Sequence, residues 1–387
     1  MSFRIHHIYI LFDPFYLKKA IVSVINDLVT DQRVHKACVA LQKSGFDVLL
    51  VGRVLPSGPP MPSRPYTVHR MKLAFSKGPL FYAEYNLRLF FLLMFTRHNL
   101  LVSNDLDTLL PNFIVSRIRR SYLVYDSHEY FTETPELVHR PTVQLVWKRI
   151  EEAILPRLDS LITVNESIAQ LFRAKYHIKT EVVRNIPPSY FDNEHFDRAW
   201  AGLPDDKKVL VLQGSGINIQ RGAEEMVSAM EHLPDCLLLI IGGGDVVDEL
   251  KKMVDDLKLE GRVLFKNRMP YQEMMRYTVL ADLGLTLDKD TNINYRFSLP
   301  NKLFDYIHAG IPVLASPLPE IKNVVEAYDI GSFISNHNPA SIAETIKGIF
   351  ADSALYSRWK ANLRLAAQDL CWEKEEEKLL RIYEKYR

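Results

Sequence analysis

Charged and polar side chains recur at helical spacing within residues 298–316, which read SLPNKLFDYIHAGIPVLAS. Asp305 lies three or four positions from each of three others, and the four side chains are predicted to share one solvent-facing side of a helix: Asn301, Lys302, Asp305 and His308. A lysine in a first helical turn is suited to binding an anion, because the helix N-terminus is positive. A carboxylate one turn further on can hold the hydroxyl groups of a ribose. This face therefore predicts a site for a nucleotide sugar, and the alternative is the solvated face of an amphipathic helix.

The two ends of this helix are also marked in the sequence. Pro300 is tolerated in a first helical turn, and Ser298 just before it is a candidate cap. Gly310 predicts the end of the helix, and residues 311–315 predict a short buried strand. The side predicted to be buried carries apolar residues at a spacing close to 3.6, namely Leu303, Phe304 and Ile307.

A second candidate anion site follows the apolar strand predicted at 208–213. Gly214, Ser215 and Gly216 allow the backbone to come close to a phosphate, with N–H groups directed at it. Arg221, at the start of the next helix, can donate paired hydrogen bonds to phosphate oxygens. The pattern is not the six-residue dinucleotide fingerprint, and no acidic residue stands where an NAD ribose would need one. The alternative is a plain turn.

A third group of polar residues ends the strand predicted at 122–125. Asp126 and His128 follow this strand directly, and such positions in a parallel sheet usually line the ligand site. A histidine there can bind a sugar or transfer a proton, and the alternative is a capped loop. Further along, Asp288 and Asp290 have the spacing of a metal-binding pair, but we expect a solvated loop and no metal site.

Length and composition limit the class of protein. With 387 residues, the chain is too long for one ordinary core and fits two domains. A formal net charge of +1 gives no electrostatic reason to bind nucleic acid. The three cysteines show no Cys-x-x-Cys spacing, which predicts a reducing compartment and no zinc site. Because no secretory signal pattern opens the sequence, we expect a cytoplasmic location.

Residues 80–95 are the most membrane-like stretch. They are fewer than the roughly 20 apolar residues that a spanning helix needs, and Glu84 interrupts them. The stretch predicts a helix in peripheral contact with anionic lipid at the inner face of the membrane, and the alternative is a core helix. Basic residues lie in or near it: Lys72, Lys77, Arg88 and Arg97.

Strands and helices alternate through both halves of the chain. This alternation predicts an α/β protein with two Rossmann-like, doubly wound domains that face a cleft. The segment 188–206 interrupts the alternation with prolines and charges, and we interpret it as a linker. The predicted domains are therefore 1–187 and 207–371, followed by a last helix at 372–387.

These motifs resemble those of the retaining glycosyltransferases of family 4 (group 1), which have the GT-B fold. Residues 298–316 are similar to the C-terminal signature of that family, and Arg221 with the glycine after it looks like a second family element. Residues 125–129 and the helix start at Asp31 resemble the N-terminal domain. The helix at 372–387 is similar to the one that packs back on the first domain. The resemblance covers most of the chain.

The resemblance also implies roles for single residues. Asp305 stands where the family has a glutamate that holds the ribose, and Arg221 stands at a lysine that grips the diphosphate. His128 stands at a histidine near the reacting sugar. The nucleotide-sugar site is thus expected to comprise Gly214, Ser215, Gly216, Arg221, Ser298, Pro300, Asn301, Lys302 and Asp305.

The sequence departs from the family pattern in three places. The first glutamate of the family falls at Phe297, and a common diphosphate arginine falls at Ser215. The first loop also lacks the usual glycine pair. We expect Lys302 to act as the second diphosphate cation instead. Which residue contacts the hydroxyl groups of the donor sugar is left open by the motif.

Together, the residues and the resemblance predict a glycosyltransferase. It would move a sugar from a UDP- or GDP-linked donor to a carbohydrate or lipid-linked acceptor in bacterial polysaccharide or glycolipid synthesis, with retention and without a required metal or cofactor. Residues 1–187 would bind the acceptor, with Asp126 and His128 at the site, and residues 207–371 would bind the donor. The alternatives are a sugar-nucleotide epimerase of the same fold and an inactive, nucleotide-sugar-binding regulatory relative.

Overall fold

The computed structural model describes residues 17–29, 31–55, 60–189, 196–214 and 216–387. The chain divides into two compact units. One contains residues 1–125 and 379–387, and the other contains residues 126–378. The divisions fall inside strand β5 (Tyr122–Ser127) and inside helix α16 (Trp372–Glu384). They differ from the limits 1–187 and 207–371, so the predicted domain roles remain a prediction.

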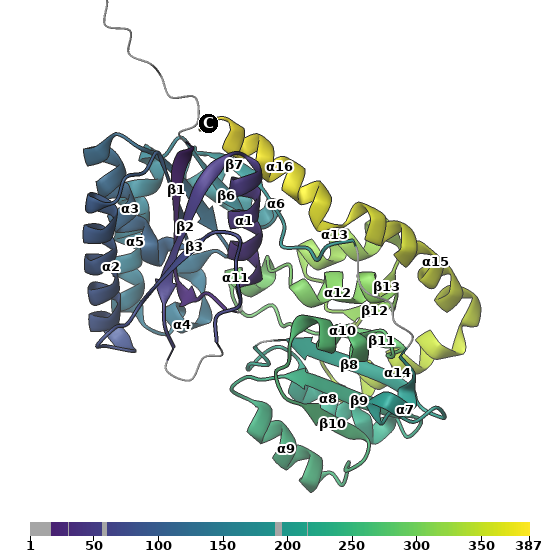
Figure 1. The fold of residues 1–387 in the computed structure, drawn as a ribbon. Coiled ribbons are helices and arrows are strands. Elements are labelled where there is room, and N and C mark those ends of the chain that lie inside the picture. Colours follow the sequence, from purple (N-terminus) through teal and green to yellow (C-terminus); the bar gives the residue numbers. More distant parts are fainter. Residues whose placement is uncertain (1–16, 30, 56–59, 190–195, 215) are drawn as a thin grey trace, which may run out of the picture. The chain divides into compact units, whose positions relative to one another are not determined.

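The first sheet has seven strands in the order β3-β2-β1-β4-β5-β6-β7. The strands β1 and β2, β1 and β4, β2 and β3, and β6 and β7 pair in parallel, and helices α1 and α6 connect β1 with β2 and β6 with β7 (Figure 1). The strands are β1 (Lys18–Asp27), β2 (Phe46–Arg53), β3 (Thr67–Met71), β4 (Leu100–Asn104), β5, β6 (Ser160–Thr163) and β7 (Lys179–Val182). The longer helices are α1 (Gln32–Lys43), α2 (Gly78–Phe95), α3 (Leu106–Arg119), α5 (Pro141–Ile154) and α6 (Glu166–Tyr176).

The second sheet has six strands in the order β10-β9-β8-β11-β12-β13, all pairing in parallel. The strands are β8 (Lys208–Gly214), β9 (Cys236–Gly242), β10 (Val263–Lys266), β11 (Leu283–Thr286), β12 (Val313–Ala315) and β13 (Gly331–Phe333). The helices that matter below are α8 (Ala223–Ala229), α10 (Tyr271–Thr278), α11 (Ile293–Arg296), α12 (Asn301–Ala309), α14 (Pro339–Ala351) and α15 (Ser353–Asp369). Two parallel α/β sheets with these strand orders confirm the predicted fold class.

Strand β8 shows why both faces of the second sheet need helices. Successive side chains of a strand point to opposite faces. Leu210 and Leu212 pack in one apolar core together with α8 and α14, whereas Val209 and Val211 pack in another together with α12. A strand that buries both faces reads as a continuous apolar run, which is the pattern of residues 209–212.

Helix α2 buries only one of its sides. Phe81, Tyr85, Leu89 and Leu93, at four-residue spacing, are at most 5% exposed. The opposite side is apolar too, and its exposed residues are Leu80, Leu87, Phe91 and Phe95. Helix α2 is therefore part of a core on one side, as the alternative interpretation predicted, and carries uncovered apolar surface on the other. Within the ranges described above, no helix is long and apolar enough to cross a membrane.

Candidate functional site

Helix α12 ends as predicted, but two of the side chains expected to face solvent are buried. Gly310 adopts a left-handed conformation with φ of 66° directly after the helix, and the apolar side is fully buried. Lys302 and Asp305 are only 8% and 6% exposed. The prediction that these two side chains point at solvent is wrong, because α12 packs against α10 on one side and α15 on another. His308 lies near α15, where its Nε2 is 2.8 Å from the Leu370 carbonyl oxygen.

The start of α12 has no side-chain cap. Pro300 occupies the cap position, so the prediction that Ser298 caps this helix is wrong. The Ser298 hydroxyl instead donates to the carbonyl oxygen of Tyr295, 2.9 Å away, at the end of α11. Asn301 is exposed in the first turn. Ser298 and Pro300 thus precede α12, and Asn301 is its first residue.

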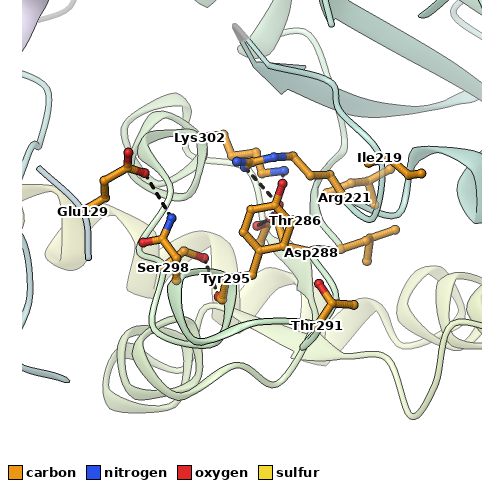
Figure 2. A network of polar contacts seen from close by, with 12 residues as sticks. Glu129, Ile219, Arg221, Thr286, Asp288, Thr291, Tyr295, Ser298 and Lys302 are labelled. Atoms are coloured by element: carbon orange, nitrogen blue, oxygen red, sulfur yellow. Dashed lines mark hydrogen bonds and ion pairs between the residues drawn. The ribbon is translucent and has the colours of Figure 1, made fainter. Parts of the chain in front are cut away.

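The carboxylate of Asp288 joins the two cations that the sequence places in separate motifs. Its Oδ1 is 3.1 Å from Arg221 Nη1, and its Oδ2 is 3.2 Å from Lys302 Nζ (Figure 2). The Thr286 hydroxyl, at the end of β11, donates to the same Oδ2 from 3.2 Å. Asp288 is 1% exposed, so the prediction of a solvated loop is wrong at this residue. We call Arg221, Asp288 and Lys302 the cation cluster.

Burial and charge oppose each other in the cation cluster. Burial by itself would raise the pKa of Asp288, but the charges of Lys302 and Arg221 outweigh it and hold that pKa below its ordinary value. Burial lowers the pKa of Lys302, and Asp288 offsets part of this effect. The cluster contains two cationic side chains and one carboxylate. It therefore has a charge imbalance that an anionic ligand would compensate.

The backbone around Arg221 brings this side chain to the cluster. Gly222 has a φ of 76°, and a Cβ atom added there would lie 2.4 Å from the Leu287 carbonyl oxygen. Only glycine allows this approach of the α8 start to the end of β11. The guanidinium carbon of Arg221 lies 4.8 Å from the centre of the Tyr295 ring. Within the described residues, the buried Nε of Arg221 has no hydrogen-bond partner, and this N–H is a donor suited to a phosphate.

The glycine turn after β8 lies beside a second glycine run that ends β9. Gly242 and Gly244 allow close contact there, since Cβ atoms on them would lie 1.8 Å and 2.0 Å from backbone oxygens of Gly214 and Ile217. By contrast, a Cβ on Gly214 would come no nearer than 3.9 Å to Gly216. Space therefore remains beside Gly214. Ser215 lies outside the described residues, so its predicted role is not addressed.

Asp305 belongs to a buried polar network at the end of β8. Its Oδ2 accepts from Gln213 Nε2 at 3.1 Å, and its Oδ1 accepts from the Tyr271 hydroxyl at 3.0 Å. The Thr278 hydroxyl donates to Gln213 Oε1 from 2.6 Å. No motif in the sequence indicates Gln213, Tyr271 or Thr278. Gln213 could have been identified as a site residue because it stands at the carboxyl end of a predicted buried strand.

The end of β5 and the residues after it hold a carboxylate and a histidine together. Asp126 is 2% exposed, and its Oδ2 lies 3.7 Å from Nε2 of His128. The next residue, Glu129, accepts a hydrogen bond at Oε2 from Asn294 Nδ2, 3.0 Å away (Figure 2). Asn294 belongs to α11, next to Tyr295 at the cation cluster. The structure therefore brings residue 129 toward the same region as residues 221 and 302.

The comparisons with known proteins agree with this geometry. Residues 195–366 match the family described as glycosyl transferases group 1. A D-inositol 3-phosphate glycosyltransferase of Xylanimonas cellulosilytica is 24% identical over 251 residues, which cover 60% of this chain and 58% of that protein. The matched part thus spans less than two thirds of that relative.

Solved structures with the same fold cover nearly the whole chain. The sucrose-phosphate synthase of Thermosynechococcus elongatus is 18% identical, with a TM-score of 0.77 over 95% of this chain and 98% of its own. HepE of Anabaena in complex with UDP-glucose is 16% identical, with a TM-score of 0.69 over 95% and 99%.

The two parallel α/β sheets form a fold of the GT-B type, which these solved structures share. Residues 195–366, less than half of the chain, match the group 1 glycosyl transferases. The family resemblance noted in the sequence agrees with this match over those residues.

Proposed function

We propose that this protein is a glycosyltransferase that takes a sugar from a nucleoside diphosphate sugar and transfers it to a carbohydrate or lipid-linked acceptor. One observation carries the proposal: two cations from separate motifs, Arg221 and Lys302, meet at one buried carboxylate with net positive charge. The family match supports a transferase. HepE, whose structure contains UDP-glucose, supports a UDP-linked donor as the first to test. Bacterial polysaccharide or glycolipid synthesis is the proposed context, with the glycosyltransferase LpsE of lipopolysaccharide core biosynthesis in Rhizobium meliloti as a relative 25% identical over 162 residues.

The proposed chemistry follows from where charge develops. As the bond between the sugar and the diphosphate breaks, negative charge grows on the leaving diphosphate. Arg221 and Lys302 would stabilise this charge, and loss of one such group typically reduces the rate by roughly 10²–10³. The N–H groups near Gly214 and Gly216 would add donors, and Asp305 would bind the ribose. No residue in this scheme requires a metal or a further cofactor.

On the acceptor side, we assign His128 and Asp126. The carboxylate of Asp126 lies 3.7 Å from Nε2 of His128. It can orient the imidazole for a hydrogen bond with a sugar hydroxyl. Transfer with retention of configuration is part of the proposal and rests on the family resemblance. An epimerase would release a changed nucleotide sugar without an acceptor, and an inactive relative would bind nucleotide without turnover.

Thermal unfolding in the presence of UDP, GDP, ADP, CMP and NAD tests the donor assignment. A ligand at 100 times its Kd should stabilise the protein by roughly 2.7 kcal/mol. We expect stabilisation by one nucleoside diphosphate, and its loss in Lys302→Met. Lys347→Met, at an exposed lysine of α14 paired with Glu344, is the matched control. If Lys302→Met and Arg221→Met both keep the full stabilisation, the donor site lies elsewhere.

We also propose peripheral contact with anionic membranes through 80–95. The exposed apolar residues of α2 have neighbours of the same kind on α3, which packs beside it (Figure 1). Exposed basic residues lie close in sequence to the ends of these helices, namely Lys72, Lys77, Arg97, Arg117, Arg119 and Arg120. The apolar side consists of Leu80, Leu87, Phe91 and Phe95 on α2 and Leu110, Ile114 and Ile118 on α3, each at least 38% exposed. Apolar side chains flanked by basic ones are the combination that binds an anionic lipid surface.

Flotation with liposomes tests this contact. We expect the protein to float with vesicles of phosphatidylglycerol and phosphatidylcholine, and the double variant Phe91→Ser, Phe95→Ser to stay at the bottom. Leu365→Ser, at a 63% exposed residue of α15, is the control and should float. Equal flotation of all three proteins would contradict the assignment to α2.

A further inference from the structure

The proposed donor site lacks a group for the hydroxyls of the transferred sugar. Arg221 and Lys302 are cations suited to the diphosphate, and the side chain of Phe297, where the family motif has a glutamate, has no group that accepts a hydrogen bond. We propose that Glu129 is the carboxylate that binds hydroxyl groups of the donor sugar, with Asn294 as the residue that positions it. This inference rests on the proposed function and extends it to the sugar.

Asn294 holds Glu129 in a defined place. Its Nδ2 donates to Glu129 Oε2 at 3.0 Å, and its Oδ1 accepts from the backbone N–H of Tyr130 at 3.1 Å. Asn294 is 8% exposed, and its hydrogen bond with the Tyr130 N–H is buried. The hydroxyl of Ser127 further fixes this turn by donating to the carbonyl oxygen of Glu129 at 2.7 Å. The side chain of Glu129 is therefore oriented before any ligand binds, which lowers the entropy cost of binding.

Glu129 lies near the cation cluster through its contact with α11. Asn294 and Tyr295 are neighbours in α11, and the Tyr295 ring lies 4.8 Å from the guanidinium carbon of Arg221 (Figure 2). Burial lowers the pKa of Arg221, but Asp288, Tyr295 and the charge of Glu129 together raise it above its ordinary value. The carboxylate of Glu129 therefore lies near the proposed diphosphate site. The sugar of the donor is bonded to that diphosphate, so it would lie close to Glu129.

The other carboxylates of the site are more deeply buried than Glu129. Asp288 is 1% exposed and pairs with both cations, and Asp305 is 6% exposed and accepts from Gln213 and Tyr271. Asp126 is 2% exposed beside His128. Glu129 is only half-buried. Among these four carboxylates, it is the one that retains substantial contact with solvent and can therefore meet a ligand.

The chemistry suits a sugar. An ionised carboxylate offers two oxygens as acceptors and no donor, and hydroxyl groups are donors that such oxygens bind well. A hydrogen bond to a charged group is worth enough that its loss should weaken binding by about 10- to 100-fold. The same carboxylate would not favour a bare diphosphate, because the charges repel. Glu129 should therefore act on the nucleotide sugar and not on the nucleotide.

Calorimetric titration of Glu129→Gln with nucleotides and their sugar esters tests this assignment. The probes are UDP with UDP-glucose and UDP-N-acetylglucosamine, and GDP with GDP-mannose. For the pair that the wild type binds, we expect the ratio of the two Kd values, sugar ester over nucleotide, to rise about 10- to 100-fold. The Kd of the nucleotide itself should change less than threefold. Glu152→Gln, at an exposed glutamate of α5, is the control and should leave the ratio unchanged.

A second variant separates sugar binding from a structural role. Asn294→Ala should raise the same ratio by a smaller factor, since Glu129 remains but loses its orientation. An unchanged ratio in both Glu129→Gln and Asn294→Ala, with nucleotide binding intact, overturns the role of Glu129 but not the proposed function. If both variants lose binding of the nucleotide and of the nucleotide sugar in parallel, the role of Glu129 is also overturned. A folded wild type that binds none of the probes overturns the proposed function together with this inference.

Discussion

Helix α12 buries charged side chains, whereas helix α2 exposes apolar ones. In α12, Lys302 and Asp305 are 8% and 6% exposed, and in α2, Phe91 and Phe95 are 50% and 84% exposed. Helix α12 is packed on more than one side, by its own sheet and by α10 and α15, so even its polar side is covered. The buried charges persist there because partners compensate them. The comparison teaches that the neighbouring elements, and not the polarity of a side chain alone, decide whether it is buried. Both the buried charges of α12 and the exposed apolar side of α2 lie where a ligand is proposed.

The largest effect is expected at Lys302. Lys302→Met leaves the buried carboxylate of Asp288 with one cation instead of two, and breaking a buried ion pair typically costs about 3–5 kcal/mol. Unfolding in urea measures this loss, and the transfer rate should fall by roughly 10²–10³ if turnover is present. The double variant Lys302→Met, Asp288→Asn should regain part of the stability but not the rate. A single variant as stable as the wild type would show that the buried charges do not depend on each other.

The two sides of α2 should respond very differently to truncation. Leu89 is 0% exposed, and Leu89→Ala should cost about 3 kcal/mol through lost contacts and a cavity. Phe91→Ala, two residues on and 50% exposed, should change the free energy of unfolding by about 0.5 kcal/mol or less. Equilibrium unfolding of both variants checks the difference. Similar losses in both would mean that the outer side of α2 is covered in the folded protein.

A pair of glycines tests how Arg221 reaches Asp288. Gly222 and Gly202 have similar φ values of 76° and 69°, but a Cβ on Gly222 would lie 2.4 Å from the Leu287 carbonyl oxygen, whereas one on Gly202 meets nothing within 4 Å. Gly202→Ala should cost about 1 kcal/mol through the backbone conformation alone. Gly222→Ala should cost more, about 2–3 kcal/mol, and should also weaken nucleotide binding. Nucleotide binding that survives in Gly222→Ala would mean that the close approach does not position Arg221.

The smallest effect is expected from pH. The pKa of Asp288 in the folded protein is held below its ordinary value, since Lys302 and Arg221 outweigh the effect of burial. The folded state therefore favours the ionised form, and this contribution to stability is present above the unfolded pKa and is lost as pH falls through the lower folded pKa. The midpoint of urea unfolding should decline below pH 4 more steeply in the wild type than in Asp288→Asn. Equal slopes would contradict the ion pairs.

Much of the fold could be predicted because its signals are local. The run at 209–212 predicts a strand buried on both faces, and Gly310 predicts the left-handed residue that ends α12. The two cations of the cluster were also predicted, since each belongs to a motif. Asp288 was not, because in sequence it is part of the polar stretch Asp288-Lys289-Asp290, and this looks like a solvated loop. Only the pairing of β11 with its neighbours and the approach of Gly222 make it a buried partner.

The sequence by itself determined the alternation of strands and helices, and which residues could bind a phosphate. These properties depend on neighbours within a few positions, through propensity, periodicity and caps. The tertiary structure alone decided that Lys302 and Asp305 are buried, that Arg221 and Lys302 share one carboxylate, and that Asn294 holds Glu129. Those contacts join residues 14 to 165 positions apart. No local preference encodes such distances, because they are set by the packing of whole elements.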